Sequence, residues 1–581
     1  MSSSPTPASP SPNRWLLPLV VFVVALGIRL LGIGWGLPSD RHQQSFHPDE
    51  PVVWFYSQQI QPAAFDFTPG FYNYGTLYLT ALKVATDVTA GYTGGGLDPQ
   101  KPEEAWRFVG RSHMAGRWIS ALAGSATALL ALLILRRFTN DLGAVCGGLF
   151  VAFAPAHVVH SRFQTVDVLA AFLIALSAYF ALRIIPVLHV EEKWNPVKLA
   201  ILSGTFAGLS AGTKYTGILC LLTLWVAVLG GGVSGKWRVA LAGTGAAILA
   251  FLISTPGILL ETKQFLDGFM YETKHVKEGH GLIFEGTSSG FVFHLANLFF
   301  GAGLLMGLFG LIGLFGATYR KHWWAIALVA FFVPYYIVIA GAEVKFIRYT
   351  FPLYIGLAIG FGWLMGTARN KGGTWHAIVA LGLLGLGGIF GGGLQTAAKY
   401  STWMMRPDPR DLAGDYLRSA GGSIGLVSDP WFYTPSIHPP LGRRLIYEAG
   451  MPMVGLAPFG EYLDRLTANL EAPQIIRYVP VNSDGTRDLK ARVDWDERLL
   501  TDSMPQYVVY SSFENEGLDR IGRLSNPSPA GKTTFDRAKT FMDRLRSEYT
   551  LDRVFGAGEP MIHDMMYVQP RLWVWKRKPD L

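Results

Sequence analysis

Phe46–Pro51, with the sequence Phe-His-Pro-Asp-Glu-Pro, follows the first long apolar run of the chain, Trp15–Trp35. That run is long enough to cross a bilayer, so the hexapeptide is predicted at a membrane surface. Its prolines fix the backbone and remove two donors, which places Asp49 and Glu50 at a rigid turn that opens into a helix. A carboxylate held there can abstract a proton or hold a cation. The structural alternative is that the turn only caps the helix.

The composition around this turn is that of a membrane protein. The 581 residues are 50% hydrophobic and 16% charged, with a mean hydropathy of +0.27. This is too apolar for an ordinary soluble enzyme. The net charge of +8 is spread through short loops, which indicates membrane topology and not a nucleic-acid surface. The two cysteines, Cys146 and Cys220, lie in apolar runs and define neither a disulfide framework nor a zinc site.

The positions of the basic residues predict the orientation of a polytopic α-helical chain. Tyr74–Ala90 is apolar on one side but contains Lys83 and Asp87, so it either crosses the membrane or lies in the interface. If it does not cross, clusters such as Arg136-Arg137 and Arg320-Lys321 share one side, which the positive-inside rule assigns to the cytoplasm. The N-terminus is then inside and the C-terminus outside. About eleven spans follow, near 15–35, 114–135, 142–159, 166–186, 197–212, 214–231, 238–256, 291–317, 323–341, 346–367 and 375–395.

Three regions are predicted along the chain. Residues 1–14 form a disordered cytoplasmic tail, 15–398 a transmembrane domain with an outer loop at 36–111, and 399–581 an extracytoplasmic α/β domain. In the last region the apolar runs shorten and no catalytic motif is found. Its periodicity predicts short elements: helices at Asp411–Arg418 and Thr534–Tyr549, and strands at Ser423–Ser428, Gln506–Tyr510 and Leu572–Trp575.

Ionisable residues gather on the predicted outer side. Arg162 and Asp167 lie at a helix-to-helix turn, and charges at membrane depth are usually functional or paired. The structural alternative pairs these two residues and makes Thr165 a helix cap. Lys214 lies at the next outer turn, where a lysine that snorkels to the interface is the simpler interpretation.

Two more outer segments are rich in cations and histidines. His275 and His280 could hold a metal or a phosphate, although two histidines five residues apart are weak evidence for a metal. Lys345 and Arg348 are three residues apart at a helix start, where both the charge bias and the helix dipole disfavour cations. An anionic partner is therefore expected, either Glu343 or a lipid phosphate.

Together these motifs resemble the membrane glycosyltransferases of the protein O-mannosyltransferase and aminoarabinose-transferase type, which are glycosyltransferase family 39-like and share the GT-C fold. The resemblance covers most of residues 15–420. It implies eleven to thirteen spans with interfacial helices in the first outer loop. One departure is that Thr68–Tyr74 lacks the acid-Lys-Pro-Pro motif with which relatives help to bind the lipid phosphate or a metal. The segments that carry the resemblance are the His-Pro-Asp-Glu turn, Arg117–Ser120, Ser161 to Asp167, Gly279-His280, Arg348 to Pro352 and Asp408–Leu412.

The resemblance implies an enzyme that transfers a sugar from a polyprenyl-phosphate-linked donor to an acceptor hydroxyl on the extracytoplasmic face, with inversion. Asp49 is the expected base and Glu50 an auxiliary acid. The acceptor would be a protein, a lipid or a glycan, and no nucleic acid is involved. A divalent metal is left open, with His275, His280 and Glu50 as candidate ligands. The candidate donor- or phosphate-binding residues are Lys345, Arg348, Tyr349, His280, Arg162 and Asp167.

Two other classes of protein remain as alternatives. A secondary transporter also has many spans, but transporters place their charges near the bilayer midplane and often contain internal repeats. Here the charges gather at one predicted surface and no repeat is found. A non-catalytic membrane scaffold that presents the outer domain would not depend on Asp49.

Overall fold

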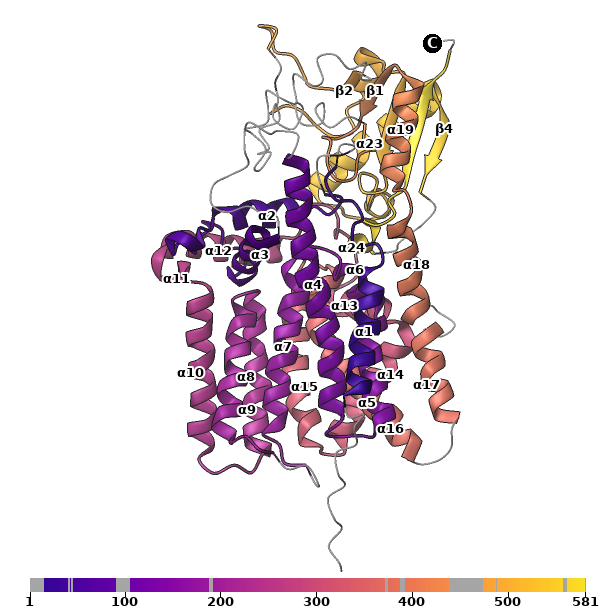
Figure 1. Cartoon of the computed structure of the whole chain (residues 1–581). Helices are drawn as coiled ribbons and strands as arrows, with labels where there is room; N and C mark the ends of the chain where they lie inside the picture. The colour runs from indigo at the N-terminus through magenta and orange to yellow at the C-terminus, as the bar shows by residue number, and fades with distance from the viewer. Residues whose placement is uncertain are drawn as a thin grey trace, which may run out of the picture.

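The computed structural model describes residues 15–39, 42, 45–89, 105–187, 192–370, 375–386, 392–437, 474–486, 488, 490–556 and 562–579. The predicted disordered tail at 1–14 lies outside these residues. The described chain is mostly helical and carries a five-stranded sheet near its C-terminus (Figure 1). The predicted fold class, a helical membrane protein with a C-terminal α/β domain, is confirmed.

Most helices stand side by side in one bundle (Figure 1). Within the described residues, five helical segments are long and apolar enough to cross a membrane, at 108–135, 166–183, 236–254, 323–340 and 347–368, and six shorter apolar segments accompany them. The elements of the bundle are α1 (Leu16–Leu30), α4 (Ala105–Leu135), α5 (Asp141–Phe153), α6 (Pro155–His160), α7 (Val166–Arg183), α8 (Pro196–Ala211), η3 (Tyr215–Cys220), α9 (Leu221–Gly230), α10 (Lys236–Ser254), α13 (Gly290–Ala302), α14 (Leu304–Tyr319), α15 (Trp323–Ala340), η4 (Ile347–Leu353), α16 (Tyr354–Asn370), α17 (Trp375–Leu386) and α18 (Gly393–Met405).

The predicted span at 291–317 is two helices, because the chain breaks at Gly303 between α13 and α14. Gly303 has a φ of +103° and forms an isolated β-bridge with Gly392. A Cβ at Gly303 would lie 3.2 Å from the Cα of Gly392. Only glycine combines this backbone conformation with so close an approach of two chains, which explains the break.

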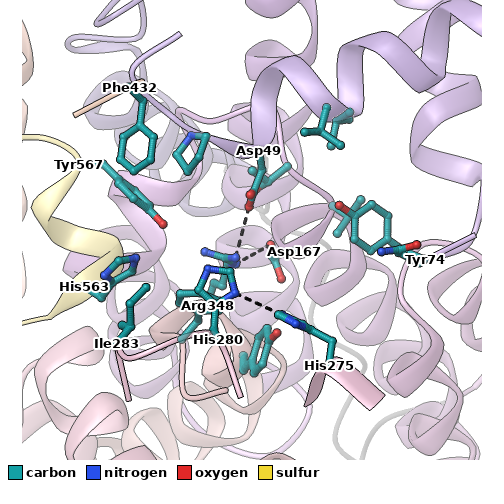
Figure 2. Close-up of a pocket in the computed structure, with 18 of the residues that line it drawn as sticks. Asp49, Tyr74, Asp167, His275, His280, Ile283, Arg348, Phe432, His563 and Tyr567 are labelled. Atoms are coloured by element: carbon teal, nitrogen blue, oxygen red, sulfur yellow. Dashed lines mark hydrogen bonds and ion pairs between the residues drawn. The ribbon is translucent and has the colours of Figure 1, made fainter. Parts of the chain in front are cut away.

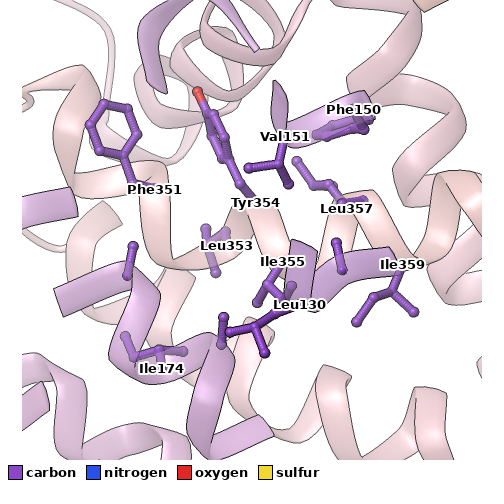
Figure 3. Close-up of a cluster of buried hydrophobic side chains, with 14 of the residues drawn as sticks. Leu130, Phe150, Val151, Ile174, Phe351, Leu353, Tyr354, Ile355, Leu357 and Ile359 are labelled. Carbon is purple, nitrogen blue, oxygen red and sulfur yellow. The ribbon is translucent and has the colours of Figure 1, made fainter. Parts of the chain in front are cut away.

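Close packing holds the bundle together. In Figure 3, residues of α4, α5 and α7 surround the segment in which η4 continues into α16, with Phe351, Leu353 and Leu357 buried among them. On the other side of the bundle, Gly204 of α8 lies so close to Gly243 of α10 that a Cβ would overlap its carbonyl group. Small residues at such contacts are typical of helix association in lipid, where packing and not the hydrophobic effect drives assembly.

A layer of short helices, the outer helix layer, lies across the end of the bundle that is uppermost in Figure 1. It contains α2 (Asp49–Gln59), η1 (Pro62–Ala64), α3 (Leu77–Thr89), α11 (Gly257–Leu260) and α12 (Thr262–Glu278). Val53, Tyr78 and Leu82 form a small core that packs α2 and α3 against Val166 at the start of α7. Within the predicted segment Tyr74–Ala90, α3 therefore lies crosswise, as the interfacial alternative predicted, and Ala90 lies outside the described residues.

The C-terminal part folds around a sheet of strand order β2-β1-β3-β5-β4, with β2, β1 and β3 parallel and β5 antiparallel to both β3 and β4. Phe541 and Leu545 of α23 pack on one face of the sheet, and Leu417 of α19 packs on the other. The five predicted elements are all present, whereas β2 and β4, at the edges of the sheet, were not predicted. The elements are α19 (Pro409–Ala420), β1 (Ser423–Leu426), β2 (Gln474–Arg477), η6 (Leu499–Ser503), β3 (Tyr507–Ser511), α22 (Leu518–Ile521), α23 (Pro529–Glu548), β4 (Tyr549–Phe555), α24 (His563–Met566) and β5 (Leu572–Arg577).

The C-terminal domain is fixed to the bundle at two places. The Asp408 carboxylate accepts a hydrogen bond from the Trp35 indole at 3.0 Å, and the Arg410 guanidinium lies 3.7 Å from the centre of the Phe46 ring. Met565 and Tyr567, in and directly after α24, belong to the main hydrophobic core of the bundle. The segment around α24 is therefore built into the membrane domain, and this places C-terminal residues beside the outer helix layer.

Candidate active site

A cavity of about 440 Å³ lies where the outer helix layer, the end of the bundle and the C-terminal domain meet (Figure 2). This volume is in the usual range for a small-molecule site. Its wall combines charged and aromatic side chains. Its lining includes Asp49, Tyr74, Thr165, Asp167, Lys214, Glu272, His275, His280, Arg348, Tyr349, Trp431, Phe432, Tyr433, Phe513, His563 and Tyr567.

Asp49 is the first residue of α2 and points into this cavity (Figure 2). Its side chain is 35% exposed, whereas that of Glu50 is completely buried. Successive residues of a helix point about 100° apart, so the same turn directs one carboxylate to the cavity and the next to the protein interior. The predicted rigid turn is present, and its two acids have different surroundings.

Arg348 lies at the centre of the charged residues. Its Nη2 atom is 3.2 Å from Asp49 Oδ2, its Nε atom is 3.7 Å from Asp167 Oδ2, and its Nη1 atom is 3.6 Å from Asp564 Oδ2. The guanidinium also lies 4.0 Å from the centre of the Phe346 ring. An anionic partner was expected for Arg348, and the structure provides three carboxylates from distant segments. Glu343 is not one of them.

Lys214 supplies a second cation to the cavity. Its Nζ atom is 2.6 Å from Asp167 Oδ1 and 4.2 Å from the centre of the Tyr349 ring. Lys214 does not snorkel away from the protein, because Asp167 holds it against the wall. Asp167 therefore bridges two cations, and Tyr349 lines the same cavity.

Asp564 is a site residue that sequence reasoning missed. Its carboxylate accepts backbone N–H groups from Ile347 at 3.2 Å and from Arg348 at 3.3 Å, in addition to its ion pair with the guanidinium. It therefore orients both the start of η4 and the Arg348 side chain. Its four-residue helix, α24, carries no motif, so only the packing of the C-terminal domain could reveal it.

Glu50 does not line the cavity. Arg117 donates to both of its carboxylate oxygens, at 2.8 and 2.7 Å, and the backbone N–H of Gln164 donates at 2.7 Å. Burial alone would raise the pKa of Glu50, but the charge and hydrogen bonds of Arg117 outweigh it and lower the pKa to about 2. The geometry is that of an anchor between α2, α4 and the turn before α7, and not of an acid poised for chemistry.

Replacing Glu50 with glutamine is expected to destabilise the protein by about 3–5 kcal/mol, because Arg117 would be left buried without its counter-charge. The lowered pKa of Glu50 predicts further that this stabilisation is present above about pH 4.3 and is lost as the pH falls toward 2. Thermal unfolding of the wild type and of Glu50→Gln in detergent measures the difference in stability. An unchanged melting temperature for Glu50→Gln would contradict the anchor role.

Arg162 and Lys345, expected as phosphate-binding residues, also lie away from the cavity. Arg162 donates to the backbone oxygens of Ile28 and Arg29, at 2.5 and 3.2 Å, and to Ser401. It joins α1 to α18 and does not pair with Asp167. Lys345 contacts Thr287 at 3.1 Å and Glu343 at 3.4 Å. Pairing with Glu343, the local alternative to a lipid phosphate, therefore holds for Lys345 but not for Arg348.

His275 and His280 line the cavity together, with His280 Nδ1 3.3 Å from His275 Nε2. Burial, assisted by the charge of His275, lowers the pKa of His280 to about 4. Burial also raises the pKa of the neighbouring Glu272. Over the part of the chain that the structure describes, no three histidine, cysteine or acidic side chains converge as metal ligands, and Glu50 is engaged elsewhere.

The segment that departs from the family pattern contributes aromatic groups. Tyr74 lines the cavity, and burial raises the pKa of its phenol, so it remains a neutral hydrogen-bond donor. The Tyr72 hydroxyl donates to Glu261 at 2.5 Å, and the Tyr215 hydroxyl donates to the Tyr72 carbonyl at 2.8 Å. These bonds fix the segment beside α11 and η3. Cations for the site come from Lys214 and Arg348 instead.

Comparison with known proteins agrees with the family resemblance seen in the sequence. Residues 86–253 match the family model of dolichyl-phosphate-mannose-protein mannosyltransferase. No curated protein sequence matches the chain. The match confirms the resemblance to GT-C membrane glycosyltransferases and the expectation of an enzyme of this class.

Solved structures that are similar to the chain include the following three. ArnT from Cupriavidus metallidurans in the apo state is 15% identical, with a TM-score of 0.46, over 96% of this chain and 97% of that one. The oligosaccharyltransferase of Archaeoglobus fulgidus is 12% identical, with a TM-score of 0.47, over 90% and 72%. A protein O-mannosyltransferase complex of S. cerevisiae is 18% identical, with a TM-score of 0.32, over 45% and 35%.

Proposed function

We propose that this chain transfers a sugar from a polyprenyl-phosphate-linked donor to an acceptor hydroxyl at the outer membrane face, with Asp49 as the base. The observation that carries the proposal is the Asp49 carboxylate, which faces a cavity beside the cations Arg348 and Lys214. The matching family is named for a dolichyl-phosphate-mannose donor, which supports a polyprenyl phosphate sugar as the substrate class.

The Asp49–Arg348 ion pair suggests the order of events. While the two groups are paired at 3.2 Å, Arg348 masks the base. A donor phosphate bound by Arg348 and Lys214 would replace Asp49 as the anionic partner, since charge-assisted bonds to phosphate are strong. Asp167 and Asp564 would keep the guanidinium in place during this exchange. Asp49 is then available only when the donor is bound.

The reaction itself is a single inverting displacement. The acceptor oxygen attacks the anomeric carbon from the face opposite the lipid phosphate, and its proton passes to the Asp49 carboxylate. The bond between the anomeric carbon and the phosphate oxygen breaks, and its electron pair stays on that oxygen. Arg348 and Lys214 stabilise the charge that develops there. The polyprenyl chain would lie between helices of the bundle.

The test of this function is a donor-lipid assay with the purified full-length chain. Incubation with polyprenyl-phosphate-linked sugars in the presence of candidate peptide, lipid and glycan acceptors should release polyprenyl phosphate and label one acceptor class. A transporter or a scaffold would do neither. Wild-type protein that turns over no donor would contradict the proposal.

The proposed orientation places the N-terminus in the cytoplasm and the C-terminal domain outside. Helix α10 runs from the basic segment Lys236-Trp237-Arg238 at the lower end of the bundle to α11 and α12 at the upper end (Figure 1). The basic segment thus lies at the end of the bundle away from α11 and α12. By the positive-inside rule, this supports a cytoplasmic location for that end.

Cysteine labelling is expected to reproduce this orientation. An impermeant maleimide should label cysteines placed at the exposed positions Lys274 and Asp484 in whole cells, but not at Lys321 or Lys236. The native cysteines, Cys146 and Cys220, are buried and should give a low background. Labelling at 321 and 236 after permeabilisation is the control. Labelling at 321 in intact cells would overturn the orientation.

A further inference from the structure

The segment around α24 brings a histidine of the C-terminal domain into the cavity wall. His563 begins this helix, and Figure 2 shows it beside Tyr567 on the side of the cavity opposite Tyr74. Two residues that follow His563 hold the segment in place. Asp564 accepts the backbone N–H groups of η4, and Arg410 donates to the Tyr567 carbonyl at 2.7 Å. The position of His563 is therefore determined by the bundle as much as by its own domain.

Glu516 fixes the orientation of the His563 ring. His563 Nδ1 lies 2.6 Å from Glu516 Oε2, and the two side chains are only 9% and 19% exposed. Nδ1–H therefore donates to the carboxylate, which leaves Nε2 for a molecule in the cavity. Both ring nitrogens of an imidazolium are donors, so the charged ring can donate from Nδ1 to Glu516 and from Nε2 into the cavity.

The arrangement of charges in the cavity indicates a role for His563. The two cations on the wall, Arg348 and Lys214, are already in contact with carboxylates. Asp167 and Asp564 would stay against them when a phosphate replaces Asp49. A phosphate that gains negative charge as its bond to the sugar breaks would face this acidic surround. A further hydrogen-bond donor that is charged is therefore needed on the cavity wall.

We propose that His563, oriented by Glu516, donates a hydrogen bond from Nε2 to an oxygen of the donor phosphate and stabilises that phosphate as it leaves. This inference rests on the proposed function. The hydrogen bond moves no proton from the histidine. The acceptor proton goes to Asp49, and the electron pair of the broken bond stays on the phosphate oxygen. The C-terminal domain would thereby supply a catalytic residue.

The surroundings of His563 contain few other groups that titrate. Glu516 faces it from the turn after β3, and His280 faces it from the loop after α12. Tyr567 lies on its own segment with a ring-to-ring distance of 5.7 Å, and the remaining neighbours are the Phe346, Phe513 and Phe284 rings. Arg348 lies beyond Phe346, and Asp564 is turned toward η4. The pKa of His280 is lowered to about 4, so His280 stays neutral at both pH 6 and pH 8.

The test is the affinity of the full-length protein for undecaprenyl phosphate at pH 6 and pH 8. His563→Gln is expected to weaken binding about tenfold at pH 6, the scale of a charged hydrogen bond, and much less at pH 8, where histidine is ordinarily neutral. The ratio of wild-type to variant affinity cancels the titration of the phosphate, since both proteins bind the same ligand. Glu516→Gln should show the same trend with a smaller amplitude.

His280→Gln is the matched control, because a neutral histidine of the same cavity should change affinity by the same factor at both pH values. A wild-type to His563→Gln ratio that equals one, or that does not depend on pH, overturns the inference. If His563→Gln does not fold, Glu516→Gln decides, and an unchanged pH dependence in that variant has the same meaning. Wild-type protein that binds no undecaprenyl phosphate contradicts the proposed function itself, whereas normal wild-type binding with an unaffected His563→Gln variant contradicts only this inference.

Discussion

Asparagine at position 49 is expected to abolish sugar transfer while the protein remains folded in the membrane. The amide keeps the size of the side chain but cannot accept the acceptor proton, and loss of a general base typically costs about 10²–10⁴-fold in rate. Folding should survive because Asp49 is 35% exposed and Arg348 retains Asp167 and Asp564 as partners. Release of polyprenyl phosphate from a sugar-linked donor, with melting temperature measured in parallel, checks both halves of the expectation.

Asp267→Asn is a suitable control for this variant. Asp267 is also a carboxylate of the outer helix layer, but its side chain is 71% exposed and lies 3.9 Å from Lys263 on α12, outside the cavity. Its substitution should leave transfer unchanged. Transfer by Asp49→Asn within about threefold of wild type would remove Asp49 from the role of base, since a base contributes far more. It would also favour the scaffold interpretation of the chain.

Arg348→Ala is expected to weaken binding of the donor lipid by about 1.5–3 kcal/mol, which corresponds to about 10–150-fold in Kd. The guanidinium is the group around which the carboxylates of the cavity are arranged, and it offers the planar donor fork that suits a phosphate. The melting temperature should fall as well, because Asp167 and Asp564 are buried and would lose a cation. A thermal-shift titration with undecaprenyl phosphate measures both effects.

Lys345→Ala separates a local charge effect from contact with the phosphate. Lys345 is a cation of the same turn, but it pairs with Glu343 and does not line the cavity. Its substitution should leave affinity for undecaprenyl phosphate unchanged. An unchanged affinity in Arg348→Ala, even with a lower melting temperature, would end the assignment of Arg348 to the phosphate and leave it a purely structural ion-pair partner.

Local sequence alone determined most helices of the membrane domain and the position of Asp49 at the start of α2. Apolar runs and the distribution of basic loops predicted the helices of the bundle, and the crosswise helix α3 followed from the same charge pattern. The two prolines beside Asp49 and Glu50 predicted the turn at which α2 begins. Hydrophobic periodicity and backbone restriction act over a few residues, so a single sequence displays them directly.

Only the tertiary structure decided which charged residues share the site. Asp49 and Glu50 are adjacent in sequence, yet Asp49 faces the cavity while Glu50 is buried against Arg117. Arg348 meets Asp564, 216 residues away, through a short helix that no motif marks. Ion pairs of this kind depend on how distant segments pack, and they leave no period or spacing in the chain. The sequence therefore marked Asp49, the proposed base, whereas the fold placed the cations and the C-terminal residues that surround it.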